Sequence, residues 1–234
     1  MLKKIKYRLV RFIAETYKHI KFRLLKKNLF SSYKDYEYAQ NVKWQSHESD
    51  ITKYIDGQER FINEWMSDID RDKKILDICC GDGIGLKYFK KLGFKDLTGV
   101  DFNTEKLEIA KKTGYDVFLQ DFHSLDIFKD GTFDIVYSSH SLEHALNPEK
   151  VVNEFNRILK KDGMLILVLP FPDLKECNEE AHCAKYKLGT NKEDEGKTVI
   201  KYIEKSGFSL LEKRFDSYRE PEIWLKFSKS MTNV

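Results

Sequence analysis

A glycine-rich turn is the first place where this chain could hold a ligand with its backbone. Residues 74–79 read as a buried strand, and Gly81, Gly83 and Gly85 follow it before a helix expected at 84–92. Glycine lets the backbone approach a ligand closely, and the helix N-terminus offers N–H groups and the positive end of a dipole. Folds that seat a pyrophosphate use the spacing G-x-G-x-x-G, whereas these glycines alternate with single residues. The turn indicates a nucleotide-type ligand, and its spacing disfavours a dinucleotide.

Carboxylates lie at the ends of successive predicted strands. Asp77 belongs to the first strand, Asp101 ends the second, and Asp121 follows the third, with Phe122 beside it. A carboxylate after the second strand can accept hydrogen bonds from both hydroxyls of a ribose. The next carboxylate could receive an exocyclic amine, and an aromatic ring could lie against adenine. Any one of these acids is more often a turn residue, but the series in register with the glycine turn indicates a nucleoside site.

The elements that position these residues alternate between short apolar strands and amphipathic helices, a pattern typical of a parallel sheet covered on both faces. A helix at 51–66 precedes them, and two directly joined strands with Pro221 at their turn end the chain. We predict an α/β fold: a Rossmann-like, seven-stranded, mostly parallel sheet with helices on both faces and a C-terminal antiparallel β-hairpin. The strands are expected at 74–79, 96–101, 115–119, 133–138, 164–169, 207–214 and 222–228, with helices at 84–92, 103–112, 148–160 and 195–206.

The chain is predicted to have two parts, residues 1–50 and 51–234, and its positive charge is concentrated at the start of the first. Residues 1–30 carry ten Lys or Arg and one acid, Glu15, so their net charge is +9. Because the whole chain has a net charge of +3, the remainder has a net charge of −6. The segment 1–30 has helical apolar spacing, so it is expected to pack on its own domain or a partner; peripheral contact with an anionic membrane is the alternative. An aromatic-rich stretch, 33–44, follows as a lid or a connector. The acidic body argues against a nucleic-acid partner.

Composition narrows the setting further. No run reaches the roughly 18–20 apolar residues that span a bilayer, and no secretory signal is recognised at the N-terminus. Four cysteines, two of them adjacent, do not form a disulfide framework. We therefore expect a reduced, cytoplasmic protein. The oligomeric state is left open.

Three motifs in order resemble one family. The segment Leu76-Asp77-Ile78-Cys79-Cys80-Gly81-Asp82-Gly83 resembles the Asp-x-Gly-x-Gly-x-Gly motif of class I S-adenosylmethionine-dependent methyltransferases. Residues 133–144 (Phe-Asp-Ile-Val-Tyr-Ser-Ser-His-Ser-Leu-Glu-His) and 153–163 resemble the fourth strand and following helix of the ubiquinone-biosynthesis-like, small-molecule branch, type 11. The resemblance covers about residues 51–228 and includes the terminal hairpin. One departure is Cys79, which stands where the family has its first glycine.

The resemblance implies S-adenosylmethionine as the cofactor and assigns residues to it. Asp77 would lie near the methionine amino group, Asp101 with neighbouring Phe102 would hold the ribose, and Ser138 would lie beside the reactive methyl group. The backbone around Cys79, Gly81 and Gly83 would cradle the cofactor, and Asp121 with Phe122 would hold the adenine. Cys79 is expected to be tolerated rather than to act as a nucleophile.

Transfer of a methyl group to a hydroxyl needs a base with a pKa near the working pH. His140, directly after the fourth strand, is the first candidate, and His144 is the second, with a bracing role preferred for it. The loop 170–194 is long for a connection, which suggests a functional insertion, and it adds Asp173 and His182. The spacing of Cys177, His182 and Cys183 is not a familiar zinc pattern, so no metal is expected. Glu220 and Glu222 are expected at the surface.

These observations predict O-methylation of a small molecule such as a sugar or a quinone, with N- or C-methylation left open. The segment 138–141 (Ser-Ser-His-Ser) differs from the Asn/Asp-Pro-Pro-Tyr of enzymes that methylate amino groups of adenine or glutamine, which disfavours DNA as the acceptor. Two alternatives remain: a lipid-linked or surface-glycan substrate reached through residues 1–30, and a catalytically silent cofactor-binding or scaffold protein. A nicotinamide-dependent oxidoreductase is disfavoured by the glycine spacing and the terminal hairpin.

Overall fold

The computed structural model describes residues 30, 32–45, 51–174 and 181–230. The chain divides into two compact units, Met1–Gln45 and Ser46–Val234. In the first unit, helix α2 (Tyr33–Gln45) carries the buried ring of Tyr36 against Phe30, with ring centroids 5.5 Å apart. Of the predicted basic segment 1–30, residues 1–29 lie outside the described residues, and so does the side chain of Trp44. Whether the aromatic-rich stretch 33–44 is a lid stays a prediction.

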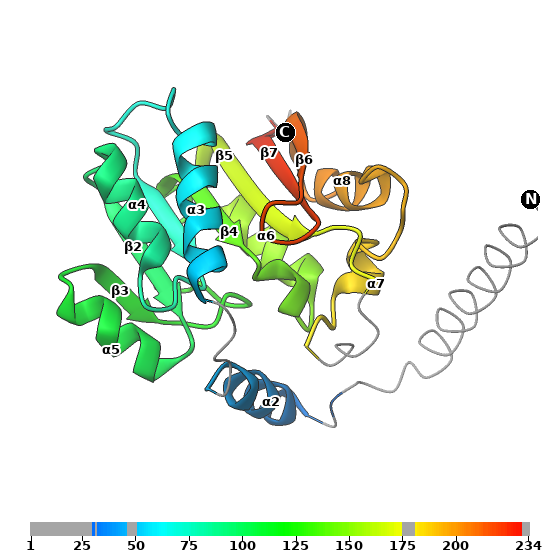
Figure 1. Ribbon diagram of the computed structural model, residues 1–234, viewed down its shortest axis with the longest axis horizontal. Coiled ribbons are helices and arrows are strands. Elements are labelled where there is room, and N and C mark those ends of the chain that lie inside the picture. Colours follow the sequence, from blue (N-terminus) through cyan, green and yellow to red (C-terminus); the bar gives the residue numbers. More distant parts are fainter. Residues whose placement is uncertain (1–29, 31, 46–50, 175–180, 231–234) are drawn as a thin grey trace, which may run out of the picture. The chain divides into compact units, whose positions relative to one another are not determined.

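The second unit is built on a seven-stranded sheet in the order β3-β2-β1-β4-β5-β7-β6 (Figure 1). The first five strands along the chain are parallel, and β7 runs antiparallel to both β5 and β6. The strands are β1 (Ile75–Ile78), β2 (Leu97–Asp101), β3 (Asp116–Leu119), β4 (Phe133–Ser139), β5 (Leu159–Pro170), β6 (Phe208–Asp216) and β7 (Glu222–Lys229). This topology confirms the predicted fold class, terminal hairpin included.

The helices lie where the amphipathic patterns predicted them. They are α3 (Ile51–Trp65), α4 (Ile84–Leu92), α5 (Thr104–Lys112), α6 (Pro148–Ile158) and α8 (Lys197–Glu204), together with a short α7 (Lys185–Leu188) and a 3₁₀ turn, η1 (Leu142–His144). Two of them begin at asparagine caps, because the side chains of Asn103 and Asn147 accept hydrogen bonds from backbone N–H groups three residues on. Such caps help to fix where each loop ends and the helix starts.

Alternation along the buried strands builds a core on each face of the sheet. Leu165 and Leu167 of β5 pack with α6 and α8, whereas Ile166 and Val168 pack with the aromatic residues of α3 and α4. Both faces of the central strands are therefore covered, as a parallel sheet requires. The order of strands reverses between β1 and β4, and ligands bind such folds outside the carboxyl ends at this point.

Among the described residues, no helix combines the length and the apolar character that are needed to span a membrane.

Candidate functional site

The turn after β1 has a backbone that favours glycine. Cys79, Gly81 and Gly83 have φ values of 56°, 55° and 89°. A β-carbon added at Gly83 would come within 3.0 Å of the Tyr115 ring, whereas at Gly81 it would meet only Lys106, at 3.7 Å. Cys79 is thus a non-glycine residue in the left-handed region, which explains why glycine is common at this position of the motif.

Substitution of Cys79 by glycine tests how much this strain costs. Relief of the left-handed conformation contributes about 1–2 kcal/mol, but glycine loses about 0.5–1 kcal/mol through backbone entropy, and the thiol's packing against the core is lost. We therefore expect Cys79→Gly to change the free energy of unfolding by less than about 1 kcal/mol. Urea denaturation measures this change. Destabilisation beyond about 2 kcal/mol would mean that packing of the thiol outweighs the strain.

Asp77 lies beneath the first turn of α4. A β-carbon on Gly85 would come within 2.4 Å of its Oδ2, so Gly85 is needed to make room for the carboxylate. Asp77 is buried, and Oδ2 makes no hydrogen bond within the described part of the chain. Burial, and secondarily the neighbouring charge of Asp101, raises the pKa of Asp77 well above its usual range. This carboxyl group is suited to receive a cation from a ligand.

Asp101 ties the end of β2 to the glycine turn. Its Oδ2 accepts a hydrogen bond from the Gly81 N–H at 2.9 Å, and its Oδ1 accepts one from the Asn103 N–H at 2.8 Å. Burial raises the pKa of Asp101, while these backbone hydrogen bonds oppose the rise. Each carboxylate oxygen has a second lone pair, so Asp101 can hold the turn and still accept hydrogen bonds from hydroxyls.

Asp121 is fixed by the histidine two residues later. Its Oδ1 accepts hydrogen bonds from the His123 backbone N–H and Nδ1, each at 2.8 Å. His123 Nε2 accepts from the Asn147 N–H at 3.2 Å, which assigns the ring proton to Nδ1. Although burial raises the pKa of Asp121, the hydrogen bonds from His123 outweigh it and lower the pKa. Phe122 turns its ring into the core, and Phe102 is only half-buried.

The end of β4 lies directly beside the glycine turn. Ile78 pairs with Ser138 in the register of the sheet, and the Ser141 hydroxyl donates to the Ile78 carbonyl at 3.3 Å. Ser138 is fully buried, and no hydrogen bond to its Oγ is found among the described residues. Burial raises the pKa of the Cys79 thiol, and the charges of Asp101, Asp77 and Glu143 raise it further, against a smaller lowering by a hydrogen bond with Ser141. A protonated thiol is a poor nucleophile, which agrees with the passive role expected for Cys79.

His140 follows β4 in the left-handed conformation, at φ 49°. Its Nε2 lies 2.9 Å from Glu222 Oε2, and its Nδ1 lies 3.4 Å from Glu220 Oε1 and 3.6 Å from Glu143 Oε1. Burial, with the charge of Arg219, lowers the pKa of His140 in spite of these carboxylates. Both ring nitrogens thus face carboxylates, an arrangement that holds the ring in place.

The expectation that Glu222 lies at the surface was wrong. Glu222 is 3% exposed, because the antiparallel pairing of β7 with β5 places it opposite Pro170, at the carboxyl end of the sheet. It accepts hydrogen bonds from Trp224 Nε1 at 2.7 Å and from Arg219 at 2.8 Å. Burial raises the pKa of Glu222, but the hydrogen bond and charge of His140, then Arg219 and Trp224, lower it to about 2. Glu220 is partly exposed, with 28% of its side chain accessible.

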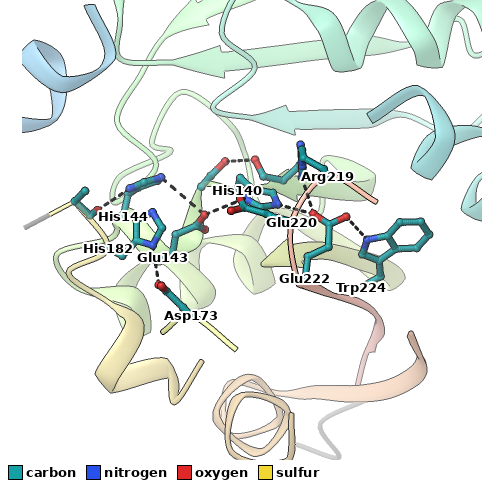
Figure 2. Close-up of polar contacts among 12 residues, drawn as sticks. His140, Glu143, His144, Asp173, His182, Arg219, Glu220, Glu222 and Trp224 are labelled. Carbon is teal, nitrogen blue, oxygen red and sulfur yellow. Dashed lines mark hydrogen bonds and ion pairs between the residues drawn. The ribbon is translucent and has the colours of Figure 1, made fainter. Parts of the chain in front are cut away.

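A second group of side chains lies next to His140 (Figure 2). His182 Nδ1 is 2.7 Å from Asp173 Oδ2, His144 Nδ1 is 2.6 Å from the Ala181 carbonyl oxygen, and the two imidazoles meet edge to face at 4.9 Å. Glu143 Oε1 lies 3.8 Å from His144 Nε2. We call Glu143, His144 and His182 the histidine–glutamate cluster. Of its three side chains, His182 is the most accessible, at 14%.

Backbone contacts between η1 and the loop after β5 assemble this cluster. The Ala184 N–H donates to the Glu143 carbonyl at 3.0 Å, and the Cys183 thiol donates to the His144 carbonyl at 3.0 Å and the Ala145 carbonyl at 3.2 Å. Burial raises the pKa of Cys183 to about 12, so its thiol is protonated and can donate to these carbonyl oxygens. Cys177 lies outside the described residues. The loop that was expected to be functional thus brings His182 and Asp173 to the end of β4.

Two groups of predicted residues therefore gather at the carboxyl edge of the sheet. The glycine turn and the acids Asp77, Asp101 and Asp121 form one, at the ends of β1, β2 and β3. The histidines His140, His144 and His182 with Asp173 form the other, after β4 and β5. The sequence did not single out Glu143, Glu222 or Arg219, although Glu143 stands in the quoted fourth-strand motif directly before His144.

Comparison with known proteins bears on both groups. Residues 76–167 match the family described as a methyltransferase domain, a segment that includes the glycine turn, all three acids and η1. A ubiquinone biosynthesis O-methyltransferase of Colwellia psychrerythraea is 33% identical over 100 residues, which cover 40% of this chain and 40% of that protein. The chain spans less than half the length of the curated relatives it matches, about 40–44%.

Solved structures share the fold over a larger part of the chain. An S-adenosylmethionine-dependent methyltransferase from Mesorhizobium loti superposes with a TM-score of 0.58 at 14% identity, covering 74% of this chain and 99% of that one. The cyclase SpnF superposes with a TM-score of 0.60 at 16% identity, covering 75% and 80%. At these identities the likeness establishes the fold alone. Over residues 76–167 this chain is therefore similar to a methyltransferase domain, and its fold is that of solved S-adenosylmethionine-dependent methyltransferases.

Proposed function

We propose that this protein transfers the methyl group of S-adenosylmethionine to a hydroxyl oxygen of a small molecule. The observation that carries the proposal is the juxtaposition of two groups at one edge of the sheet. Three acids and a glycine turn suit a nucleoside with a cationic tail, and a buried histidine–glutamate cluster lies next to them, after β4. The Colwellia psychrerythraea relative is an O-methyltransferase by name, which supports oxygen as the acceptor atom.

The cofactor would lie along the ends of β1, β2 and β3. The Asp77 carboxylate would pair with the amino group of the methionine moiety, since it is buried beneath α4 and lacks a hydrogen-bonded partner for Oδ2 among the described residues. Asp101 would accept from the ribose hydroxyls, and Asp121 from the adenine amino group. Phe122 would wall the adenine pocket from the core, and half-buried Phe102 is the more accessible ring. Ser138 would then lie beside the methyl group.

Activation of the acceptor hydroxyl belongs to the histidine–glutamate cluster. Transfer from a sulfonium is an in-line displacement: the acceptor oxygen forms a bond to the methyl carbon while the carbon–sulfur bond breaks, and the hydroxyl proton leaves. His140 remains a candidate base, but both of its ring nitrogens face carboxylates. His182 is oriented by Asp173 and is more accessible, in the way a carboxylate orients a catalytic imidazole. The geometry thus favours His182 over His140.

The raised pKa of Asp77 predicts that cofactor binding depends on pH. Without cofactor, burial and Asp101 keep Asp77 protonated above its usual range, and a cationic amino group beside it would favour the carboxylate. Affinity for S-adenosylmethionine should therefore rise as pH rises from about 4, the usual value, through the raised pKa, with release of a proton. Stability of the cofactor-free protein should fall over the same range, because the folded state holds the proton longer than the unfolded chain.

Calorimetry in two buffers of different ionisation enthalpy measures the released proton. Asp77→Asn is the matched variant, and it should bind more weakly with no proton release. If the affinity for S-adenosylmethionine did not change with pH in either the wild type or Asp77→Asn, Asp77 would not face the amino group.

An assay for the product of the donor tests the reaction class. The protein is incubated with S-adenosylmethionine and a panel of hydroxylated aromatics and sugars, and S-adenosylhomocysteine is measured. We expect acceptor-dependent formation of S-adenosylhomocysteine and a methyl ether as product. Methylation of nitrogen or carbon, with hydroxylated compounds inert, would contradict oxygen as the acceptor. Conversion of the acceptor without formation of S-adenosylhomocysteine would indicate a reaction other than methyl transfer. The structural neighbour SpnF, which is named as a cyclase, is an example of this fold with another reaction in its name.

Two alternatives have less support. A lipid-linked acceptor rests on residues 1–30, all but one of which lie outside the described residues. A catalytically silent protein would rest on Cys79, but the backbone around Cys79 keeps the left-handed path of the glycine turn.

A further inference from the structure

The ligand atoms of Glu143, His144 and His182 all lie within 4.8 Å of one another. Glu143 Oε1 and His144 Nε2 are 3.8 Å apart, too long for a hydrogen bond. Bonds of about 2.1 Å to a tetrahedral metal ion place its ligand atoms about 3.4 Å apart. The spacing therefore suits a metal ion between the three side chains better than a shared proton, and it needs only a small closure.

Both histidines are oriented as metal ligands usually are. The Ala181 carbonyl and the Asp173 carboxylate can only accept hydrogen bonds, so Nδ1 carries the proton in both His144 and His182. The Nε2 atom of each ring then has the lone pair. A ligating histidine commonly donates its other N–H to a carbonyl or a carboxylate in this way. Figure 2 shows His144, His182 and Glu143 side by side, with Asp173 below them and joined to His182 by a dashed line.

The Glu143 carboxylate is an independent indication of a cation site. It is 1% exposed, and neither oxygen has a hydrogen-bond partner in the described ranges. A buried carboxylate without hydrogen bonds is costly unless a cation compensates it. The nearest titratable group in these contacts is His140, whose Nδ1 lies 3.6 Å from Glu143 Oε1 and whose Nε2 is engaged by Glu222.

We propose that Glu143, His144 and His182 bind one divalent metal ion of the zinc type, with Asp173 as the residue that orients His182. Two imidazoles and one carboxylate suit Zn²⁺, Co²⁺, Mn²⁺ or Fe²⁺ better than Mg²⁺. Three protein ligands leave a coordination position open, as in catalytic zinc sites. The site replaces the Cys177–His182–Cys183 grouping weighed from the sequence, because Cys183 faces carbonyl oxygens.

The metal site gives the cluster a definite role, and this role alone rests on the proposed function. A hydroxyl of the acceptor would occupy the open position, and the metal would lower its pKa. The proton would leave to solvent rather than to His182, whose Nε2 would hold the metal. The oxyanion would then attack the methyl carbon as the carbon–sulfur bond breaks and S-adenosylhomocysteine leaves. Metal binding itself does not depend on the identity of the acceptor or on the cofactor.

Titration with Co²⁺ tests the site directly. The full-length protein is prepared without a histidine tag, stripped with a chelator, and titrated with Co²⁺ while its visible absorption is recorded; Zn²⁺ then competes. We expect one Co²⁺ per chain, displaced by Zn²⁺. Glu143→Gln and His182→Ala should each weaken binding by about 100-fold or more, and Asp173→Asn by about 10–100-fold, as for other residues that orient a ligand.

Two controls separate this ligand set from others. His123→Gln removes a buried histidine at Asp121, and Cys183→Ser removes the neighbouring thiol; both should bind Co²⁺ as the wild type does. Retained binding in folded Glu143→Gln and His182→Ala, weakened binding in Cys183→Ser, or no specific Co²⁺ or Zn²⁺ binding by the wild type would each overturn the proposal. Affinity for S-adenosylmethionine of the metal-free protein is measured separately, so failure of the metal site and failure of the proposed function are distinguished.

Discussion

Replacing Asp101 with alanine is expected to weaken binding of S-adenosylmethionine and S-adenosylhomocysteine by about 100-fold or more. Hydrogen bonds to a charged group contribute about 1.5–3 kcal/mol each, and two ribose hydroxyls would donate to this carboxylate. The same substitution removes the hydrogen bonds from Gly81 and Asn103 that fix the glycine turn. The loss is therefore expected in both ligands alike, because both contain the same ribose. Calorimetric titration measures it.

Asp116→Ala is the matched control for Asp101. Asp116 is the first residue of the neighbouring strand β3, and it is exposed at the opposite end of the sheet. Its loss should leave affinity for both ligands within about a factor of two, since surface substitutions change stability by about 0.5 kcal/mol or less. If Asp101→Ala and the wild-type protein bound both ligands with equal affinity, the ribose would not bind at the end of β2.

Replacing His182 with alanine is expected to lower the turnover number by about 100-fold or more, with affinity for S-adenosylmethionine nearly unchanged. As a general base, His182 would contribute a factor of about 10²–10⁴; as a metal ligand, it would instead hold the ion that activates the hydroxyl. His182 lies in the loop after β5, whereas the acids proposed for the cofactor follow β1, β2 and β3. Binding and turnover should therefore separate. Steady-state kinetics with the acceptor found by the panel, beside calorimetry, measure both.

His140→Ala provides the contrast. Because His140 is fixed by Glu222 and Glu220, its loss should lower turnover less than the loss of His182 and should disturb stability more. A large loss of turnover in His140→Ala, with His182→Ala fully active at all pH values, would restore His140 as the base and contradict the role of the cluster.

Local patterns in the sequence were sufficient to predict the sheet. Strands buried on both faces read as apolar runs, and glycine, asparagine and proline mark where they end, so β1 to β5 and their helices lie within a few residues of their predicted bounds, although β5 begins earlier, at Leu159. The positions of the three acids were predicted from the same pattern of strands. Parallel strands bring their carboxyl ends to one edge, so Asp77, Asp101 and Asp121 had to converge there.

The sequence could not predict which side chains from distant segments lie in contact. Glu143 and His182 are 39 positions apart, and they meet because the Ala184 N–H bonds to the Glu143 carbonyl across the loop after β5. Glu222 resembles a surface residue beside Pro221, and only the reversed direction of β7 turns it inward to His140. Local periodicity contains no information on such pairs, because the register between β5 and β7 is set by packing of the whole sheet.

A crystal structure of the protein with S-adenosylhomocysteine is the most direct test of the account. We predict the ligand at the carboxyl ends of β1 to β4, with its amino group at Asp77, its ribose hydroxyls at Asp101 and its adenine at Asp121. The sulfur should point toward Ser138 and the histidine–glutamate cluster, because the methyl group must reach the acceptor there. Ligand bound at another surface, or an empty sheet edge in crystals grown at saturating S-adenosylhomocysteine, would contradict it.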